Sequence, residues 1–136
     1  HDVTEMHPGN YLYYDTVQRD LGACETTDIA PRMLTRVIGH YPKQNMMLID
    51  LGWTGCSTQG SQNGFGEFLN CPELRIKVLK QEAGEVESSD GSPLPFEKYP
   101  IGSMLKLLPY HSCASTQQHQ VVNVLEGDVI VDTWAI

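Results

Sequence analysis

Leu74-Arg75-Ile76-Lys77-Val78-Leu79-Lys80-Gln81 is the stretch that indicates the fold class most clearly. Apolar and basic side chains alternate along it, as they do in a strand that buries one face. In an extended chain this pattern places Leu74, Ile76 and Val78 on the same side, toward a core. The fold class then depends on how many comparable strands surround this one.

Two apolar runs upstream of this strand predict an antiparallel hairpin. Residues 32–41 are rich in β-branched side chains and continue without a break to Pro42, and residues 46–51 form a second apolar run. The polar residues 42–45 between them have the composition of a turn. Further upstream, residues 10–15 are rich in tyrosine and alternate, which predicts another strand, and residues 17–21 favour a short helical turn that ends at Gly22.

The sequence downstream predicts more strands. Residues 82–87 are expected to continue the central strand past Gly84, and residues 104–109 form an apolar run that a proline closes. Residues 120–125 and 129–134 flank the short turn Glu126-Gly127-Asp128, which indicates a terminal hairpin.

Together these segments predict an all-β protein: a mainly antiparallel barrel or folded sheet with little helix. The 136 residues suit a single domain, 1–136. The last strand runs to Ile136 without a polar tail. We therefore expect this β-domain to be the C-terminal part of a longer chain.

Composition excludes some classes of partner. The formal net charge is −8 and lysine and arginine form no run, so nucleic acid is not an expected partner. No apolar stretch approaches the length of a membrane span. The cysteines show no compact secreted framework, which favours reduced thiols in a cytoplasmic protein, three of them with packing or loop roles: Cys24, Cys56 and Cys71.

A long loop rich in small residues occupies positions 52–66. It is either a flexible connection or a site-forming loop on a rigid sheet, and composition does not separate the two. Asp50 stands at the strand end next to it, where a carboxylate either lines a site or caps a turn.

Pro109-Tyr110-His111-Ser112-Cys113 carries the chemistry that the sequence indicates most directly. If this segment is extended, His111 and Cys113 point to the same face, and an imidazole beside a thiolate is a ligand set that zinc prefers. The alternative is that Cys113 only fills space in the core. His119 is a weaker candidate ligand, whereas His7 and His40 suit structural or surface roles.

A series of short motifs runs through the chain in a fixed order: Pro8-Gly9-Asn10-Tyr11, Arg36-Val37-Ile38-Gly39, Asp50-Leu51-Gly52, Gln81-Glu82 and Pro109-Tyr110-His111-Ser112-Cys113. In order and spacing they resemble the C-terminal domain of eukaryotic-type D-serine dehydratases, whose architecture the related D-threonine aldolases share. The resemblance implies a two-domain, alanine-racemase-like enzyme. In such an enzyme an N-terminal barrel with lysine-bound pyridoxal phosphate packs against this β-domain, and the protein is a homodimer.

The same resemblance implies roles for particular residues. It places a zinc ion on His111 and Cys113 beside the cofactor, with Gln81, Glu82, Asp50 and Tyr110 as further candidates to line the site. The implied reaction is α,β-elimination of water from D-serine to pyruvate and ammonia, with zinc as a Lewis acid on the hydroxyl. The aldolases tend to have aspartate as the second ligand, so the cysteine favours the dehydratase branch.

Two features depart from the family pattern. Glu82-Ala83-Gly84 stands where family members often have Glu-His-Gly. No lysine lies in a cofactor-binding motif, among Lys43, Lys77, Lys80, Lys98 and Lys106. We therefore expect no catalytic residue in this chain and no activity from it alone; an aldolase-like lyase and a stand-alone, non-catalytic β-domain remain the alternative interpretations.

Overall fold

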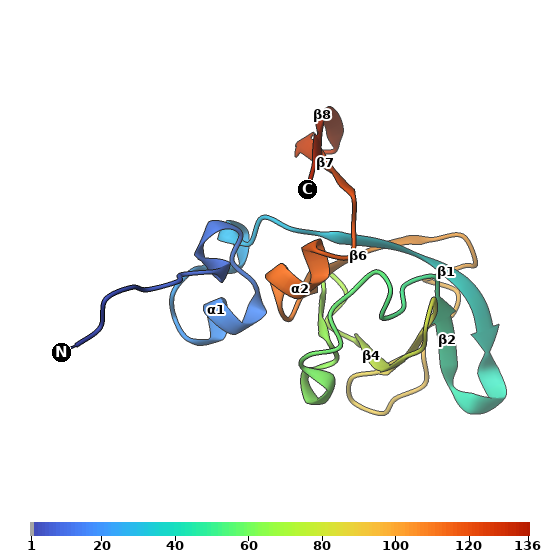
Figure 1. The fold of residues 1–136 in the computed structure, drawn as a ribbon. Coiled ribbons are helices and arrows are strands. Elements are labelled where there is room, and N and C mark those ends of the chain that lie inside the picture. The colour runs from blue at the N-terminus through green and yellow to red at the C-terminus, as the bar shows by residue number, and fades with distance from the viewer. Residues whose placement is uncertain (1) are drawn as a thin grey trace.

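An antiparallel sheet of six strands forms the body of the protein, in the order β3-β6-β1-β2-β5-β4 (Figure 1). In the computed structural model, which describes residues 2–136, the strands are β1 (Met33–Tyr41), β2 (Met46–Ile49), β3 (Gly66–Phe68), β4 (Leu74–Leu79), β5 (Gly84–Ser88) and β6 (Met104–Pro109). The outer strands β3 and β4 contact each other, so the sheet curls into a nearly closed barrel. The predicted all-β class is confirmed.

The helical segments are short and lie outside the barrel. They are α1 (Thr16–Asp20), α2 (Ser112–Thr116) and the 3₁₀ turns η1 (Asn10–Leu12), η2 (Thr26–Asp28), η3 (Pro42–Gln44) and η4 (Ser61–Asn63). Figure 1 shows α2 between α1 and the barrel strands. In residues 2–136 no helix combines the length and the apolar character that crossing a membrane requires.

Both predicted hairpins are confirmed. Strands β1 and β2 pair antiparallel, with Tyr41 opposite Met46, and η3 closes the connection through the left-handed Asn45. Strands β7 (Val121–Glu126) and β8 (Val129–Ala135) pair antiparallel around a turn at Gly127. In each case the turn residues lie next to the strands that they connect, so local sequence is sufficient to specify the pairing.

The expectation that residues 82–87 continue the central strand is wrong. The chain reverses after Leu79, where the Lys80 N–H donates to Ala83 O at 2.7 Å, and β5 returns antiparallel to β4. Gly84 begins β5 so close to its neighbours that an added Cβ would lie 2.8 Å from Leu51 O. Alternation is the same on both sides of such a turn and does not reveal the reversal.

The buried face of β4 also differs from the prediction. Leu74 and Ile76 are buried as expected, but the register shifts between Ile76 and Val78. A bulge of this kind moves the following residues to the opposite face. Leu79 is therefore buried, and Val78 is only half-buried.

The predicted strand over residues 10–15 is wrong as well. Asn10 O accepts the N–H groups of Tyr13 and Tyr14, at 3.2 and 2.7 Å, which makes a compact turn in place of an extended segment. Asp15 then caps α1 by accepting the Gln18 N–H at 3.0 Å. Tyr11 is 54% exposed, so it does not pack into the sheet as an alternating strand would require. The predicted helical turn over 17–21 corresponds to α1.

The core fills the barrel, and four neighbouring strands supply five of its completely buried side chains: Val37, Met47, Ile49, Val86 and Leu107. All the cysteines are free thiols. Cys56 belongs to the core and Cys71 packs against it, as the packing roles predicted for them require. Burial raises the pKa of the Cys56 thiol.

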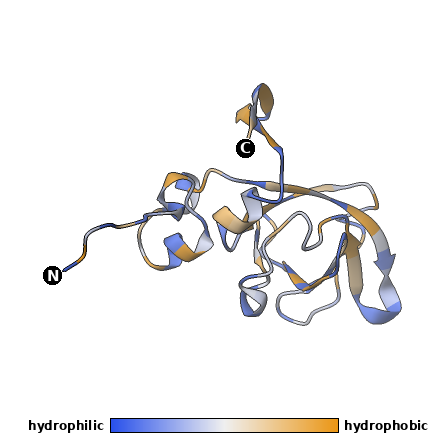
Figure 2. Cartoon of the chain, in the orientation of Figure 1, coloured by the Kyte–Doolittle hydropathy of each residue, from blue (hydrophilic) through white to orange (hydrophobic). Residues whose placement is uncertain are grey.

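The β7–β8 hairpin projects from the barrel, with apolar segments along it (Figures 1 and 2), and its turn contacts β6 where Lys106 Nζ donates to Asp128 Oδ1 at 2.6 Å. Its exposed apolar side chains are Val121, Leu125, Val129, Ile130, Val131 and Trp134. An isolated two-stranded hairpin is marginally stable in water, and a concentrated apolar surface of this kind usually contacts another polypeptide.

Glu73 forms an ion pair on the barrel surface, and this ion pair makes the stability of the protein vary with pH in the acid range. Its carboxylate accepts hydrogen bonds from Lys98 Nζ and from the Tyr99 hydroxyl, the latter at 2.6 Å, and these bonds lower the pKa of Glu73 to about 2. A lowered carboxyl pKa contributes stability that is complete above the unfolded-state value of about 4.3 and is lost as the pH falls toward 2.

We expect Glu73→Gln to lower the free energy of unfolding by about 1 kcal/mol at pH 7, because glutamine keeps the shape but loses the charge. The difference from the unchanged chain should shrink between about pH 4.3 and pH 2, where the glutamate itself becomes neutral. Urea unfolding across this range measures it. A difference that stays constant down to pH 2 would contradict the prediction.

Candidate metal site

His111 and Cys113 lie where β6 passes into α2. His111 has extended backbone and is the N-cap of α2, and Cys113 lies in the first helical turn. The expectation that both belong to one extended segment is therefore wrong. Serine, threonine and cysteine are weak helix formers, so a tertiary contact must favour the helix. One such contact is made by the Ser112 N–H, which donates to Asp15 Oδ2 at 2.9 Å.

The side chain of Asn10 joins the two candidate ligands. Its Nδ2 lies 3.0 Å from His111 Nδ1, and its Oδ1 accepts the Cys113 thiol proton at 2.7 Å. Gly9 also lies beside the thiol, since an added Cβ would be 3.8 Å from Cys113 Sγ. The imidazole and the thiol thus share one amide as their common neighbour, at the junction of the N-terminal segment with α2.

Asp15 lies beneath this amide and is completely buried. Its Oδ2 accepts from Asn10 Nδ2 at 2.7 Å and lies 3.6 Å from His111 Nδ1. The sequence interpretation did not include Asn10 or Asp15 among the site residues. A signal was present for Asp15, because an aspartate three residues before a glutamine is a common N-cap pattern.

The donor atoms fit a zinc ion. A thiolate and an imidazole are favourable zinc ligands, and both are accessible, because the His111 side chain is 27% exposed and Cys113 is exposed. Within residues 2–136 no group of three or more histidine, cysteine or acidic side chains is arranged to hold a metal. The described chain therefore offers two protein donors, which leaves coordination positions for other ligands.

The loop over residues 52–66 supports α2. The Ser57 N–H donates to Ser115 Oγ at 3.0 Å, and His119 Nε2 lies 3.0 Å from Gly55 O. At its start the loop is joined to the barrel, where the Trp53 N–H donates to Lys80 O at 2.9 Å. These bonds fit a loop that forms part of the site structure, and they use His119 to hold the loop.

Two of the other candidate residues have contacts with backbone. The Tyr110 N–H donates to Phe65 O at 3.0 Å, which joins the strand end before His111 to the loop. The Gln81 carbonyl accepts from the N–H and the hydroxyl of Thr54, at 3.1 and 2.9 Å, while its side chain is exposed.

Glu82 and Asp50 lie on other parts of the barrel surface. Glu82 is exposed in the β4–β5 turn. Asp50 Oδ1 accepts from Thr35 Oγ1 at 2.8 Å and from the Arg36 N–H at 2.6 Å, contacts that correspond to the capping alternative. Neither side chain hydrogen-bonds to His111 or Cys113 in the part of the chain that the structure describes.

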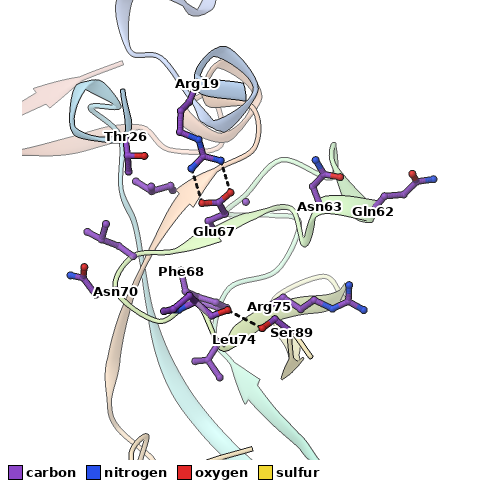
Figure 3. Close-up of a pocket in the computed structure, with 14 residues that line it drawn as sticks. Arg19, Thr26, Gln62, Asn63, Glu67, Phe68, Asn70, Leu74, Arg75 and Ser89 are labelled. Carbon is purple, nitrogen blue, oxygen red and sulfur yellow. Dashed lines mark hydrogen bonds and ion pairs between the residues drawn. The ribbon is translucent and has the colours of Figure 1, made fainter. Parts of the chain in front are cut away.

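A cavity of about 550 Å³ opens beside α1, β3 and β4 (Figure 3). Arg19 and Glu67 face each other in it, with Arg19 Nη1 donating to Glu67 Oε2 at 2.7 Å. Its lining does not include His111 or Cys113, so it is separate from the candidate metal site.

The lysines of the described chain do not supply a cofactor site. Each of four lysines forms an ion pair with a carboxylate, and their side chains are between 42% and 59% exposed: Lys77, Lys80, Lys98 and Lys106. The fifth, Lys43 in η3, is exposed as well. A lysine that forms a Schiff base must be desolvated or otherwise activated. Residues 2–136 therefore do not fit the binding of pyridoxal phosphate by themselves.

Comparison with known proteins gives a consistent set of relatives. The family described as "Putative serine dehydratase domain" matches residues 30–125. The D-serine dehydratase of Dictyostelium discoideum is 35% identical, over 93% of this chain and 34% of its own length. The D-threo-3-hydroxyaspartate dehydratase of Delftia sp. (strain HT23) is 30% identical, over 97% of this chain and 38% of its own length. The chain thus spans little more than a third of these relatives.

The solved structure of the Delftia enzyme has a TM-score of 0.84 at 29% identity, covering 93% of this chain and 37% of that one. Two further structures are alanine variants of D-threo-3-hydroxyaspartate dehydratase, at a histidine and at a cysteine two positions later, and the cysteine variant is described as metal-free. A different kind of relative is the uncharacterized protein Rv1414 of Mycobacterium tuberculosis, 27% identical over 90% of this chain and 92% of its own length.

Proposed function

This chain belongs to the putative serine dehydratase domain family, and on that premise we propose that it is the zinc-bearing β-domain of a pyridoxal-phosphate-dependent D-serine dehydratase. The observation that carries the proposal is that the side chains of His111 and Cys113 both contact the side-chain amide of Asn10. The names of the similar dehydratases support the reaction class. The alanine variants of one of them change a histidine and a cysteine two positions later, and the cysteine variant is described as metal-free. This supports a metal-binding role for His111 and Cys113, which have the same spacing.

His111 and Cys113 would hold the zinc ion. When bound there, zinc supplies a Lewis acid for the hydroxyl group that leaves the substrate. The residues of this chain have the simpler tasks of donating the imidazole nitrogen and the thiolate and of keeping both in place. Because they are only two protein ligands, coordination positions stay open for a substrate hydroxyl and for water, as a catalytic zinc site requires.

The complete reaction needs groups that residues 2–136 do not supply. Removal of the α-proton and loss of the β-hydroxyl convert D-serine into an enamine, which water hydrolyses to pyruvate and ammonia. We assign the pyridoxal phosphate and its lysine to an N-terminal barrel of the same protein, in a homodimer. The exposed apolar hairpin β7–β8 supports contact with such a further polypeptide.

The test is an assay of the full-length protein with D-serine, before and after treatment with a metal chelator. We expect pyruvate formation to fall at least about tenfold with chelator and to return with added zinc. Turnover that is insensitive to the chelator would exclude the zinc role. Glycine and acetaldehyde from D-threonine would instead favour the aldolase alternative.

A second candidate is a stand-alone β-domain without catalytic activity. The mycobacterial protein matched over 92% of its length favours it, because that relative contains little beyond this domain. The mass of the native gene product discriminates between the two proposals. A native chain near 15.2 kDa supports the stand-alone domain, and one about three times heavier supports the dehydratase.

A further inference from the structure

We propose that Asp15 is the positioning residue of the metal site: its buried carboxylate accepts the Nδ1–H of His111 when Nε2 binds the metal beside Cys113, whereas Asn10 holds both ligands in the metal-free form. This inference rests on the proposed function and extends it from the two ligands to the N-terminal segment. The metal site would then involve three separate parts of the chain: η1, the residue that caps α1, and the first turn of α2.

Asp15 provides a fixed acceptor. Its carboxylate has no exposed surface, and two backbone N–H groups donate to it. The Gln18 N–H of α1 lies 3.0 Å from Oδ1, and the Ser112 N–H of α2 lies 2.9 Å from Oδ2. A buried carboxylate with hydrogen bonds of this kind has little freedom to rotate. Its Oδ2, 3.6 Å from His111 Nδ1, therefore has a defined position relative to the imidazole.

The hydrogen bonds also determine the orientation of the Asn10 amide. A carboxylate only accepts, so the group 2.7 Å from Asp15 Oδ2 must be the amide nitrogen, which leaves Oδ1 to accept the Cys113 thiol proton. The second N–H of the amide points to His111 Nδ1, at 3.0 Å. One side chain thereby contacts the acceptor and both candidate ligands.

These contacts indicate that Nε2, and not Nδ1, is the His111 nitrogen that would bind the metal. Nδ1 of His111 is occupied by its contacts with Asn10 and Asp15, whereas Nε2 has no hydrogen-bond partner among the described residues. When Nε2 binds a metal the ring proton resides on Nδ1, and that N–H requires an acceptor. Asp15 Oδ2, 3.6 Å from Nδ1, can accept this N–H once the two side chains move slightly closer together.

Metal binding also changes the hydrogen bond of Cys113. Its thiol proton is donated to Asn10 Oδ1, and metal binding removes that proton. The bond from Cys113 to Asn10 is then lost, which releases the amide at the moment when His111 must exchange its contact with Asn10 for one with Asp15. Both ligands therefore change their hydrogen bonds through a single residue.

Cobalt binding tests the proposal. Co²⁺ is titrated into the metal-free full-length protein, and its absorption bands report cobalt–thiolate bonding. We expect Asp15→Asn to weaken Co²⁺ binding about tenfold to a hundredfold. Asn10→Ala should leave Co²⁺ binding unchanged or strengthen it, because Asn10 bonds to the two ligands only in the metal-free form. The matched control is Asp20→Asn, the same change of charge at an exposed position at the end of the same helix, and it should stay within about twofold.

Melting temperatures separate positioning from simple stability. A merely structural role lowers the melting temperature of the metal-free and Co²⁺-loaded forms equally, whereas a positioning role narrows the gap between them. If Asp15→Asn does not fold, Asn10→Ala decides. Co²⁺ binding that is unchanged or tighter supports the role of Asp15, and binding that weakens about tenfold or more shows that Asn10 holds His111 in the loaded form and overturns it. Unchanged Co²⁺ affinity in a folded Asp15→Asn protein, or an equal loss in Asp20→Asn, overturns the positioning role alone. Failure of the unchanged protein to bind Co²⁺ overturns the metal site of the proposed function, and the positioning role with it.

Discussion

Cys113→Ala and His111→Ala are each expected to remove the metal from the full-length protein and to lower pyruvate formation from D-serine at least about a hundredfold. Residues 2–136 offer two donors at the candidate site and no larger metal-binding group, so either change removes half of the protein's contribution to the ion. The loss should exceed the tenfold to hundredfold effect of changing a supporting residue. Metal content and steady-state turnover measure it.

The structure also provides the control. Cys113 is exposed and Cys24 is half-buried in the turn after α1, so neither change to alanine should cost much stability. We expect Cys24→Ala to keep both metal and turnover. A Cys113→Ala protein with full metal content and full activity would show that the ion, if it binds, binds elsewhere. Added zinc should not rescue Cys113→Ala, whereas it should rescue the chelated unchanged protein.

The parts of the fold that local sequence specifies were predictable. The hairpins β1–β2 and β7–β8 follow from apolar runs with turn residues between them, and β6 follows from an apolar run that ends at Pro109. β3 was not predicted, because Gly66–Phe68 is a three-residue strand inside a stretch that has the composition of a loop. The β4–β5 reversal was hidden for a related reason, since the same alternation continues after the turn.

The site was predictable only in part. His111 and Cys113 could be selected from residue chemistry and from resemblance, because imidazole and thiol are recognisable ligands in any conformation. Their arrangement could not be predicted, because α2 begins where the Ser112 N–H meets Asp15, a residue 97 positions away in the sequence. The same separation hid Asn10, whose tyrosine-rich neighbours favour a strand when they are considered alone.

The strand end that leads to His111 depends on one glycine in β3, and its replacement should have the largest effect on stability. Gly66 has φ +141° and pairs with Pro109 of β6, and a Cβ built on it overlaps the Leu108 carbonyl oxygen. Gly66→Ala must both strain its own backbone and separate β3 from β6. We expect it to lower the free energy of unfolding by roughly 3 kcal/mol, measured by urea unfolding.

Gly91→Ala is the matched control, because it separates backbone strain from overlap. Gly91 also has a left-handed φ, +79°, but a Cβ there meets no atom within 4 Å. Only the conformational cost should remain, about 1 kcal/mol. Equal losses from the two changes would show that β3 and β6 can separate at little cost. A larger loss at Gly66 would instead mean that the pairing of β3 with β6 stabilises the strand end that leads to His111. The candidate metal site would then depend on this pairing as well as on the contact between Asp15 and α2.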